Sequence, residues 1–254
     1  MAKSPSTGGV QSIERGFEIL EAMATESGPI GVSALAEQTG MPIPTIHRVI
    51  RTLLSLGYAR QLPNRRYALG PRLIRLGESA TQQFGTSSRT HLAELVEETG
   101  ETAKMAVLDA TMAVYVAQVP SAHSMRIFTE VGGRVRLHCS GIGKALLMQL
   151  PDSEVRALVN RVGMPQYTEN TITDADTLIA ELERSRERGY AIDEAERELW
   201  VRCFAVPVPN APNVTAISVS GPAGRVTLDE GERIVPILQR VAKQLSRDFQ
   251  REPQ

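Results

Sequence analysis

The sequence predicts an α+β protein made of a small helical module followed by a larger domain built on an antiparallel sheet. Two observations lead to this prediction. Residues 32–69 read as two short helices followed at once by a hairpin rich in arginine. After residue 86, runs with strand composition stand at both ends of a helical middle, which is typical of sheet and helices packed as layers. The length of 254 residues allows one large domain or two ordinary ones.

The N-terminal module begins with a predicted helix over Ser12–Thr25. We expect Ser12 to cap this helix, because serine oxygens accept hydrogen bonds from the free N–H groups of a first turn. We expect Ile13, Phe17 and Leu20 to form its buried stripe, since they recur at helical spacing. The Ser-Gly-Pro sequence at 27–29 then ends the helix.

A helix-turn-helix pattern comes next. Its first helix is predicted over Val32–Thr39, with Ser33 able to cap it and a Gly-Met-Pro turn after it. Its second helix begins at Pro44, since proline suits a first helical turn. At about 100° per residue, the apolar residues of this second helix fall on one face: Ile46, Val49, Ile50, Leu53 and Leu54. The opposite face carries Thr45, Arg48, Arg51 and Thr52. A helix with this division of faces is what a major-groove reader of DNA requires.

A hairpin after the second helix completes a winged module. Short strands are predicted over Tyr58–Leu62 and Arg66–Leu69, around a Pro-Asn turn. Arginines at the tip of such a wing would meet the DNA backbone or the minor groove. The residues predicted to contact DNA, with His47 at the edge of the helix face, are Thr45, His47, Arg48, Arg51, Arg65 and Arg66.

The charge distribution also indicates that the N-terminal part of the chain binds DNA. Residues 1–75 hold nine Lys and Arg against five Glu, so their net charge is +4. Since the whole chain has a net charge of −1, the remaining residues have a net charge of −5. Between Arg48 and Arg75 there is no acidic residue. A basic front and an acidic remainder indicate that only the front contacts a polyanion. The alternative is a basic surface that is simply solvated.

The rest of the chain alternates between strands and helices. A mobile tail is expected over 1–9, the winged module over 10–70, a linking helix over 71–88 and one further domain over 89–254. The linking helix has an apolar side, with Leu73, Ile74 and Leu76, for a partner helix. Strands are predicted at Lys104–Leu108, Ala113–Val119, Met125–Thr129, Tyr190–Asp193, Arg202–Val208 and Thr215–Ser220. Helices are predicted near Arg89–Thr99 and at Gly143–Leu150, Asp152–Arg161, Asp174–Arg188 and Asp229–Arg251.

Several small polar residues predict a binding cup in this second domain. Side chains alternate along a strand, so Ser218 and Ser220 share a face with Ala216, and Cys203 shares one with Ala205. Small side chains leave space, and Asp193 ends a neighbouring strand. The Ser-Gly-Ile sequence at 140–142 begins a helix, where free N–H groups favour an anion. The cup would suit a small polar acid. The alternatives are an ordinary helix cap and a polar strand edge facing solvent.

Other classes of site find no support in the sequence. There is no Ser–His–Asp ordering, no HExxH motif and no Cys/His set at metal spacing, so we expect no catalytic residue, metal or cofactor. The helix start at 140–142 fails both the phosphate-loop and the dinucleotide patterns. Two cysteines are too few for a disulfide framework. No apolar run would cross a bilayer and the start lacks a signal peptide, so a cytoplasmic location is expected.

These segments together resemble the IclR family of bacterial transcriptional regulators over nearly the whole chain. The resemblance rests on VQSIERGFEILEAM through RRYALGPRLIRLGE, on LHCSGIGKALL, and on RERGYAIDEAERELWVRCFAVPVP with AISVSGPAGRV. The last two are highly specific. NRRYALGPRLIRLGESA and YVAQVPSAHSM are similar to glyoxylate-responsive repressors of allantoin and purine catabolism.

The resemblance implies a fold, a set of partners and a ligand set. It implies a GAF-like effector domain with an antiparallel sheet, and homodimers formed through the N-terminal domains that often pair again as dimers of dimers. It also implies that the effector lies among Ser140, Gly141, Ile142, Asp193, Cys203, Ser218, Val219 and Ser220. Ile142 stands where the family has Ala, which narrows the cup. Trp200 stands where the family usually has Gly, and its ring would shield or reshape the mouth.

The sequence therefore predicts a transcriptional repressor that a small acid, glyoxylate, releases from a palindromic operator. One alternative is a regulator of the same family that responds to an aromatic acid, since small walls could admit a ring. The remaining alternative is an enzyme that acts on a small acid and depends on Cys203.

Overall fold

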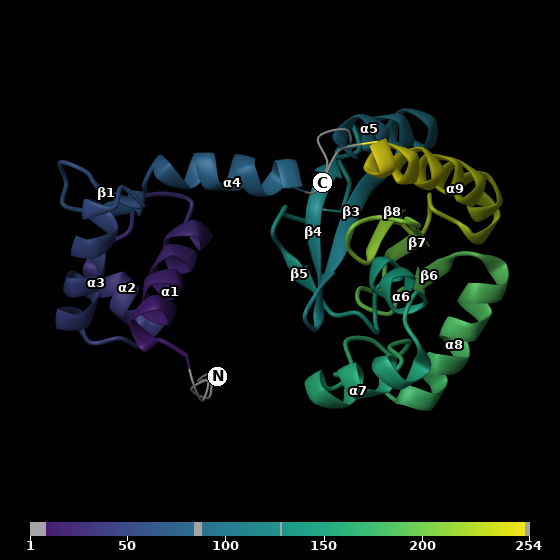
Figure 1. Cartoon of the computed structure of the whole chain (residues 1–254), viewed down its shortest axis with the longest axis horizontal. Helices are drawn as coiled ribbons and strands as arrows, with labels where there is room; N and C mark the ends of the chain where they lie inside the picture. The colour runs from purple at the N-terminus through teal and green to yellow at the C-terminus, as the bar shows by residue number, and fades with distance from the viewer. Residues whose placement is uncertain (1–8, 84–87, 128, 252–254) are drawn as a thin grey trace. The chain divides into compact units, whose positions relative to one another are not determined.

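The computed structural model describes residues 9–83, 88–127 and 129–251. The chain divides into two compact units, Met1–Ala80 and Thr81–Gln254 (Figure 1). Helix α4 (Arg72–Gln83) carries the chain from the first unit into the second. Most of the tail expected over 1–9 lies outside the described residues, as do residues 84–87 of the expected linking helix.

The first unit is a three-helix module with a two-stranded wing. Its elements are α1 (Gln11–Thr25), α2 (Val32–Thr39), α3 (Ile43–Ser55), β1 (Ala59–Gln61) and β2 (Tyr67–Leu69). The two strands pair antiparallel, and Ile30 adds an isolated bridge to Tyr67. The module has a core of its own, formed from all three helices and the wing: Ile19, Met23, Ile30, Leu35, Met41, Ile46, Ile50, Leu53, Ala59 and Tyr67.

Three predictions within this module are wrong. Helix α1 begins at Gln11, and its N-cap is Val10 rather than Ser12. Helix α2 has the predicted bounds, but its N-cap is Gly31 rather than Ser33, and neither helix start has a side-chain cap. In α1 the side chains of Ile13 and Phe17 are 57% and 62% exposed.

The buried face of α1 is formed by Ile19 and Met23. These two lie on the side of the helix opposite to Phe17, because two residues of helix turn the chain by about 200°. Leu20 is half-buried and does pack against the core, as predicted. The helix therefore carries two apolar stripes, and its periodicity alone cannot tell which one faces the core.

The second unit is an α+β domain around a six-stranded sheet. The strands are β3 (Thr102–Asp109), β4 (Met112–Val119), β5 (Arg134–Val135), β6 (Ala191–Glu194), β7 (Val201–Pro207) and β8 (Thr215–Pro222). Their order is β5-β4-β3-β8-β7-β6, and every neighbouring pair is antiparallel. The helices are α5 (Ser88–Thr99), α6 (Gly141–Leu147), α7 (Asp152–Val162), α8 (Ala175–Arg188) and α9 (Leu228–Arg251). The predicted antiparallel sheet is confirmed.

Helices cover the sheet on both faces, as Figure 1 shows. One face packs against α5 and α9 through a core that includes Phe204, Ile217 and Val219. The other face packs against α6, with α7 and α8 beyond it, through a second core that includes Ile142 and Leu146. Because alternate residues of a strand point to opposite faces, Cys203, Ser218 and Ser220 belong to the α6 side.

Two predicted elements differ from the structure. Among the described residues 125–127 and 129 there is no strand, and the edge of the sheet is β5 instead. Met125 is 69% exposed there and Ile127 lines a cavity, so the apolar composition of this segment does not reflect strand pairing. Helix α6 begins at Gly141, two residues earlier than predicted, because Ser140 caps it: its Oγ accepts from the Gly143 N–H at 3.2 Å.

No helix in the described part of the chain is both long and apolar enough to cross a membrane. Within the same residues there is no group of three or more His, Cys, Asp or Glu that could hold a metal ion.

Candidate functional site

Helix α3 presents a polar face outward from the N-terminal module. Ile46, Ile50 and Leu53 are buried in the core, whereas His47, Arg48 and Arg51 are exposed and Thr45 is half-buried. The tight connection from α2 depends on Gly40, which adopts a left-handed conformation at φ +67°. Pro44 lies in the first turn of α3, as predicted. The six residues predicted to contact DNA all belong to this helix or to the wing.

The tip of the wing is a tight turn between β1 and β2. Arg65 adopts a left-handed conformation with φ 61°, and the Arg66 N–H donates to Asn64 Oδ1 at 3.1 Å. The Arg66 guanidinium donates to the Pro29 carbonyl at 3.2 Å, which ties the wing to the loop before α2. Both arginine side chains are exposed. The structure thus places Arg65 at the tip, while Arg66 also has a structural contact.

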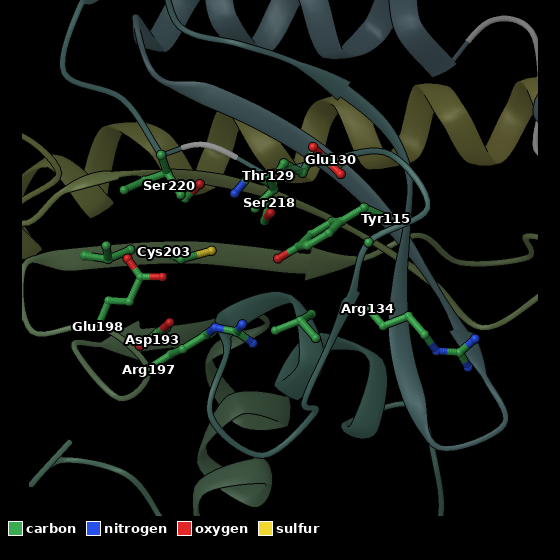
Figure 2. Close-up of a pocket in the computed structure, with 15 residues that line it drawn as sticks. Tyr115, Thr129, Glu130, Arg134, Asp193, Arg197, Glu198, Cys203, Ser218 and Ser220 are labelled. Carbon is green, nitrogen blue, oxygen red and sulfur yellow. The ribbon is translucent and has the colours of Figure 1, made fainter. Parts of the chain in front are cut away.

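A cavity of about 330 Å³ opens on the α6 side of the sheet in the second unit (Figure 2). It lies over β3, β7 and β8 and is bordered by β4, β5, the β6–β7 connection and the segment before β5. Its lining consists of Lys104, Tyr115, Ile127, Thr129, Glu130, Gly133, Arg134, Val135, Asp193, Arg197, Glu198, Val201, Cys203, Ser218 and Ser220.

Sheet register brings four of the predicted effector residues to this cavity. Cys203 pairs with Asp193 on one side and with Ser220 on the other. All four, Ser218 included, are at most 7% exposed, so they do not form a polar strand edge facing solvent. The Ser218 and Ser220 hydroxyls are buried without an oxygen or nitrogen partner among the described residues. Figure 2 shows Cys203 and Tyr115 turned toward the same space.

The other four predicted effector residues do not line the cavity. Ser140 Oγ is occupied, because it donates to the Arg136 carbonyl at 2.9 Å and caps α6. Gly141 packs against β7, where an added Cβ would lie 3.0 Å from Cys203 Sγ. The Ile142 side chain is buried in the core beside α6, and its N–H is directed to the Cys203 thiol. Val219 points to the opposite face of the sheet.

The two departures from the family pattern also lie outside the cavity. Ile142 belongs to the core and does not narrow the space. Trp200 is 81% exposed and is not part of the lining, so the expectation that its ring shields the mouth is wrong. It comes directly before β7, where its carbonyl accepts from the Ala223 N–H at 2.8 Å and its side chain faces solvent.

Lys104 is the most informative lining residue that the sequence prediction missed. It lies on β3 opposite Ser218 and is 3% exposed. Its ammonium lies 5.3 Å from the centre of the Tyr115 ring, and no carboxylate of the described residues is within ion-pairing distance of it. Burial lowers the pKa of Lys104 to about 8. A lysine inside the otherwise apolar run TAKMAVL was the signal that could have revealed it.

The charges around the cavity are mixed. Burial raises the pKa of Asp193 to about 7, and its Oδ1 accepts from the Glu196 N–H at 2.9 Å. Arg197 lies over the Tyr167 ring at 5.8 Å, whereas Arg134 turns away to pair with Asp109 at 2.6 Å. Burial raises the pKa of the Cys203 thiol to about 12, so it is protonated at neutral pH and is not an activated nucleophile.

Both units match protein families that are already described. Residues 12–63 match the IclR helix-turn-helix domain, and residues 81–247 match the family described as bacterial transcriptional regulator IclR C-terminal. The transcriptional repressor IclR of Escherichia coli is 36% identical over 253 residues, covering 97% of this chain and 92% of that protein.

Two solved structures are similar as well. The crystal structure of the IclR of Thermotoga maritima is 29% identical with a TM-score of 0.79, covering 94% of this chain and 98% of that chain. An IclR homologue from Microbacterium hydrocarbonoxydans, complexed with 4-hydroxybenzoate, has a TM-score of 0.83 and covers 95% of this chain and 100% of its own. At 21% identity, this second likeness shows the fold alone.

Proposed function

Because this chain belongs to the IclR family of bacterial transcriptional regulators, we propose that it is a repressor released from its operator when a small acid occupies the cavity over β3, β7 and β8. Members of this family are DNA-binding transcription factors, so the chain is a regulator and not an enzyme. The observation that supports an acid is the cavity itself, where a buried ammonium and two buried hydroxyls face open space.

The DNA-binding part of the proposal assigns α3 to the major groove. Arg48 and Arg51 would contact bases or phosphates with Thr45 and His47 beside them, and Arg65 and Arg66 would contact the backbone or minor groove at the wing. The exposed apolar stripe of α1, with Ile13 and Phe17, supports a homodimer or a dimer of dimers formed through the N-terminal units. Two copies related by symmetry would read a palindromic operator in the cytoplasm.

We propose glyoxylate as the effector and genes of allantoin and purine catabolism as the targets, on the resemblance of two segments to glyoxylate-responsive repressors. The carboxylate of glyoxylate would accept hydrogen bonds from the cavity's donors, and its hydrated aldehyde would donate to Asp193. Oxalate should bind worse, since its second carboxylate would meet the Asp193 carboxyl.

A second candidate effector is an aromatic acid. Two observations favour it: the Tyr115 ring lines the cavity, and the volume of about 330 Å³ exceeds the needs of glyoxylate. This volume falls within the range of about 300–1,000 Å³ found for sites of drug-sized ligands. The homologue complexed with 4-hydroxybenzoate has the same fold.

A gel-retention assay with DNA from the promoter next to the gene tests the DNA-binding proposal. Arg48→Ala combined with Arg51→Ala should abolish retention while the melting temperature stays unchanged. The matched control is Arg156→Ala combined with Arg233→Ala, which removes two exposed arginines from α7 and α9. Retention by the α3 double variant would refute the assignment of this face.

The same assay separates the two effectors. Glyoxylate should release the wild-type complex at a lower concentration than 4-hydroxybenzoate or oxalate. Release by 4-hydroxybenzoate alone would transfer the proposal to an aromatic acid.

A further inference from the structure

The second unit buries two lysines, and within the described residues only Lys144 has an ion-pair partner. Lys144 on α6 is 1% exposed and pairs with Glu196 at 2.5 Å, with Glu181 at 4.0 Å. Lys104 on β3 is 3% exposed, and its ammonium lies over the Tyr115 ring, 5.3 Å from the ring centre. Moving an ammonium from water into a protein interior is expensive unless a counter-charge and hydrogen bonds compensate it. The Lys104 ammonium therefore has no ion pair within the described part of the chain, and an acidic ligand would provide one.

The groups around Lys104 indicate which part of an acidic ligand would bind there. Ser218 is its register partner on β8, and Ser220 follows on the same face of that strand. Both hydroxyl oxygens are buried without an oxygen or nitrogen partner in the described part of the chain, and the Ser218 hydroxyl contacts the Cys203 sulfur. An ammonium and two hydroxyls supply hydrogen-bond donors, and a carboxylate supplies acceptors only. All three residues line the same cavity, in which Figure 2 labels Ser218 and Ser220.

We propose that Lys104, Ser218 and Ser220 form the subsite that holds the carboxylate of the effector, so that Lys104 is the residue that makes the regulator specific for acids. This inference rests on the proposed function, and it moves the anion from the start of α6, where the sequence placed it, to β3 and β8. The start of α6 is not available, since Gly141 and Ile142 pack against Cys203 outside the lining.

The remaining charges around Lys104 limit the ligand to a single carboxylate. Facing it are Asp193 on β6, Arg197 and Glu198 from the β6–β7 connection, Cys203 on β7 and Tyr115 on β4. Burial raises the pKa of both Cys203 and Tyr115, so these two groups are uncharged at neutral pH. The charges of Arg197 and Glu198 offset each other, so one carboxylate neutralises Lys104, whereas a second would have no uncompensated cation and would lie beside Asp193. The ligand class is therefore a monocarboxylate whose other end is polar and uncharged.

The first test measures the melting temperature of the full-length protein without ligand. Lys104→Met should melt higher than wild type at pH 7, because it removes an uncompensated ammonium. The pKa of Lys104 is lowered to about 8 in the folded state from 10.5, so its cost is fully present below pH 8 and decreases up to pH 10.5. The advantage of the variant should shrink over that range. Lys144→Met is the matched control and should melt lower than wild type, because it leaves Glu196 unpaired.

The second test measures affinity by calorimetry with sodium glyoxylate, sodium 4-hydroxybenzoate and the uncharged 4-hydroxybenzamide. Whichever acid binds the wild type should bind Lys104→Met roughly tenfold to a hundredfold more weakly, as expected for a lost charge-assisted hydrogen bond. Wild-type affinity for the acid should fall above about pH 8, and the variant's affinity should not. The amide should bind neither protein.

Two results would overturn the inference. One is a Lys104→Met variant that melts below wild type at pH 7, which would mean that the protein itself compensates the ammonium. Glu198 is the carboxylate that could do so, and strong coupling between Lys104→Met and Glu198→Gln in melting temperature would identify it. The other is undiminished acid binding by Lys104→Met. If no acid in the panel binds wild type, the proposed effectors fail, and the ligand-free comparison still decides the status of Lys104.

Discussion

The two faces of the six-stranded sheet follow different rules although the same strands form both. On the α5 and α9 side, the strands contribute large apolar side chains such as Phe204, Ile217 and Val219, which belong to one hydrophobic core. On the α6 side, the alternate positions hold Cys203, Ser218 and Ser220, and a cavity remains. Close packing is the ordinary condition of a protein interior. The difference indicates that the α5 and α9 face is packed along the strands, whereas the α6 face combines its own core with a cavity over β3, β7 and β8.

The strands also carry buried polar groups on the cavity side of the sheet. Interiors ordinarily pair nearly all their polar atoms, and an unpaired one has a cost. The hydroxyls of Ser218 and Ser220, which have no oxygen or nitrogen partner among the described residues, and the ammonium of Lys104 lie on the cavity side of the sheet. Such a cost is tolerated where function requires it. Removing these groups should therefore leave the fold intact or stabilise it, while equivalent changes on the packed face should damage it.

The largest effect is expected for Phe204→Ala. Phe204 is 1% exposed, lies 6.0 Å from the Tyr190 ring centre, and approaches α9 so closely that Gly231 has no space for a Cβ. Loss of the ring should reduce the free energy of unfolding by about 3–5 kcal/mol, measured by urea denaturation. Cys203→Ala, next along β7 but on the cavity face, is the control and should cost about 1 kcal/mol or less. Equal losses in the two variants would remove the distinction between the faces.

Lys144→Met should destabilise the domain by about 3 kcal/mol, because it leaves the carboxylates of Glu196 and Glu181 without their shared ammonium. Lys144 lies on the same side of the sheet as the cavity, so this variant separates the effect of pairing from that of position. Lys243→Met, an exposed lysine of α9, is the control and should change the free energy of unfolding by less than about 0.5 kcal/mol. If Lys144→Met leaves the free energy of unfolding unchanged, then ion pairing does not distinguish the buried Lys144 from the buried Lys104.

The sequence predicts the features of the cavity that depend on neighbouring residues in the chain, but not those that depend on contacts between distant segments. The alternation that groups Ser218 with Ser220 is a local property of a strand, so it was visible without a structure. The position of Lys104 opposite Ser218 is not local, because it requires β3 to pair with a strand more than a hundred residues away. The start of α6 was assigned to the ligand because a helix start can bind anions, but packing against Cys203 occupies it. In α1, two apolar stripes compete, and only the tertiary core selects Ile19 and Met23.

Asp193→Asn should stabilise the protein in a pH-dependent way. Burial, with the nearby Glu196 carboxylate, raises the pKa of Asp193 from 3.8 to about 7 in the folded state. Stability linked to this group is therefore present below pH 4 and is lost as the pH rises through 7. Asparagine stays neutral and keeps the acceptor for the Glu196 N–H.

Thermal unfolding at several pH values measures this effect. The variant should match wild type near pH 4 and exceed it at pH 8 by on the order of 2 kcal/mol. An advantage that does not depend on pH would show that Asp193 is ionised in the same way in the folded and unfolded chains.

The smallest effect on stability separates the two kinds of buried serine. Ser218→Ala removes a hydroxyl without an oxygen or nitrogen partner, so the free energy of unfolding should stay constant or rise by up to about 1 kcal/mol. Ser185 on α8 is the matched comparison, because it is fully buried and its hydroxyl donates to the Glu181 carbonyl at 2.9 Å. Ser185→Ala should therefore lose about 1 kcal/mol in the same urea titration. The stabilising effect of a bound acid should weaken in Ser218→Ala and stay unchanged in Ser185→Ala. If both serines cost the same, the Ser218 hydroxyl is satisfied within the protein, and the carboxylate subsite reduces to Lys104 and Ser220.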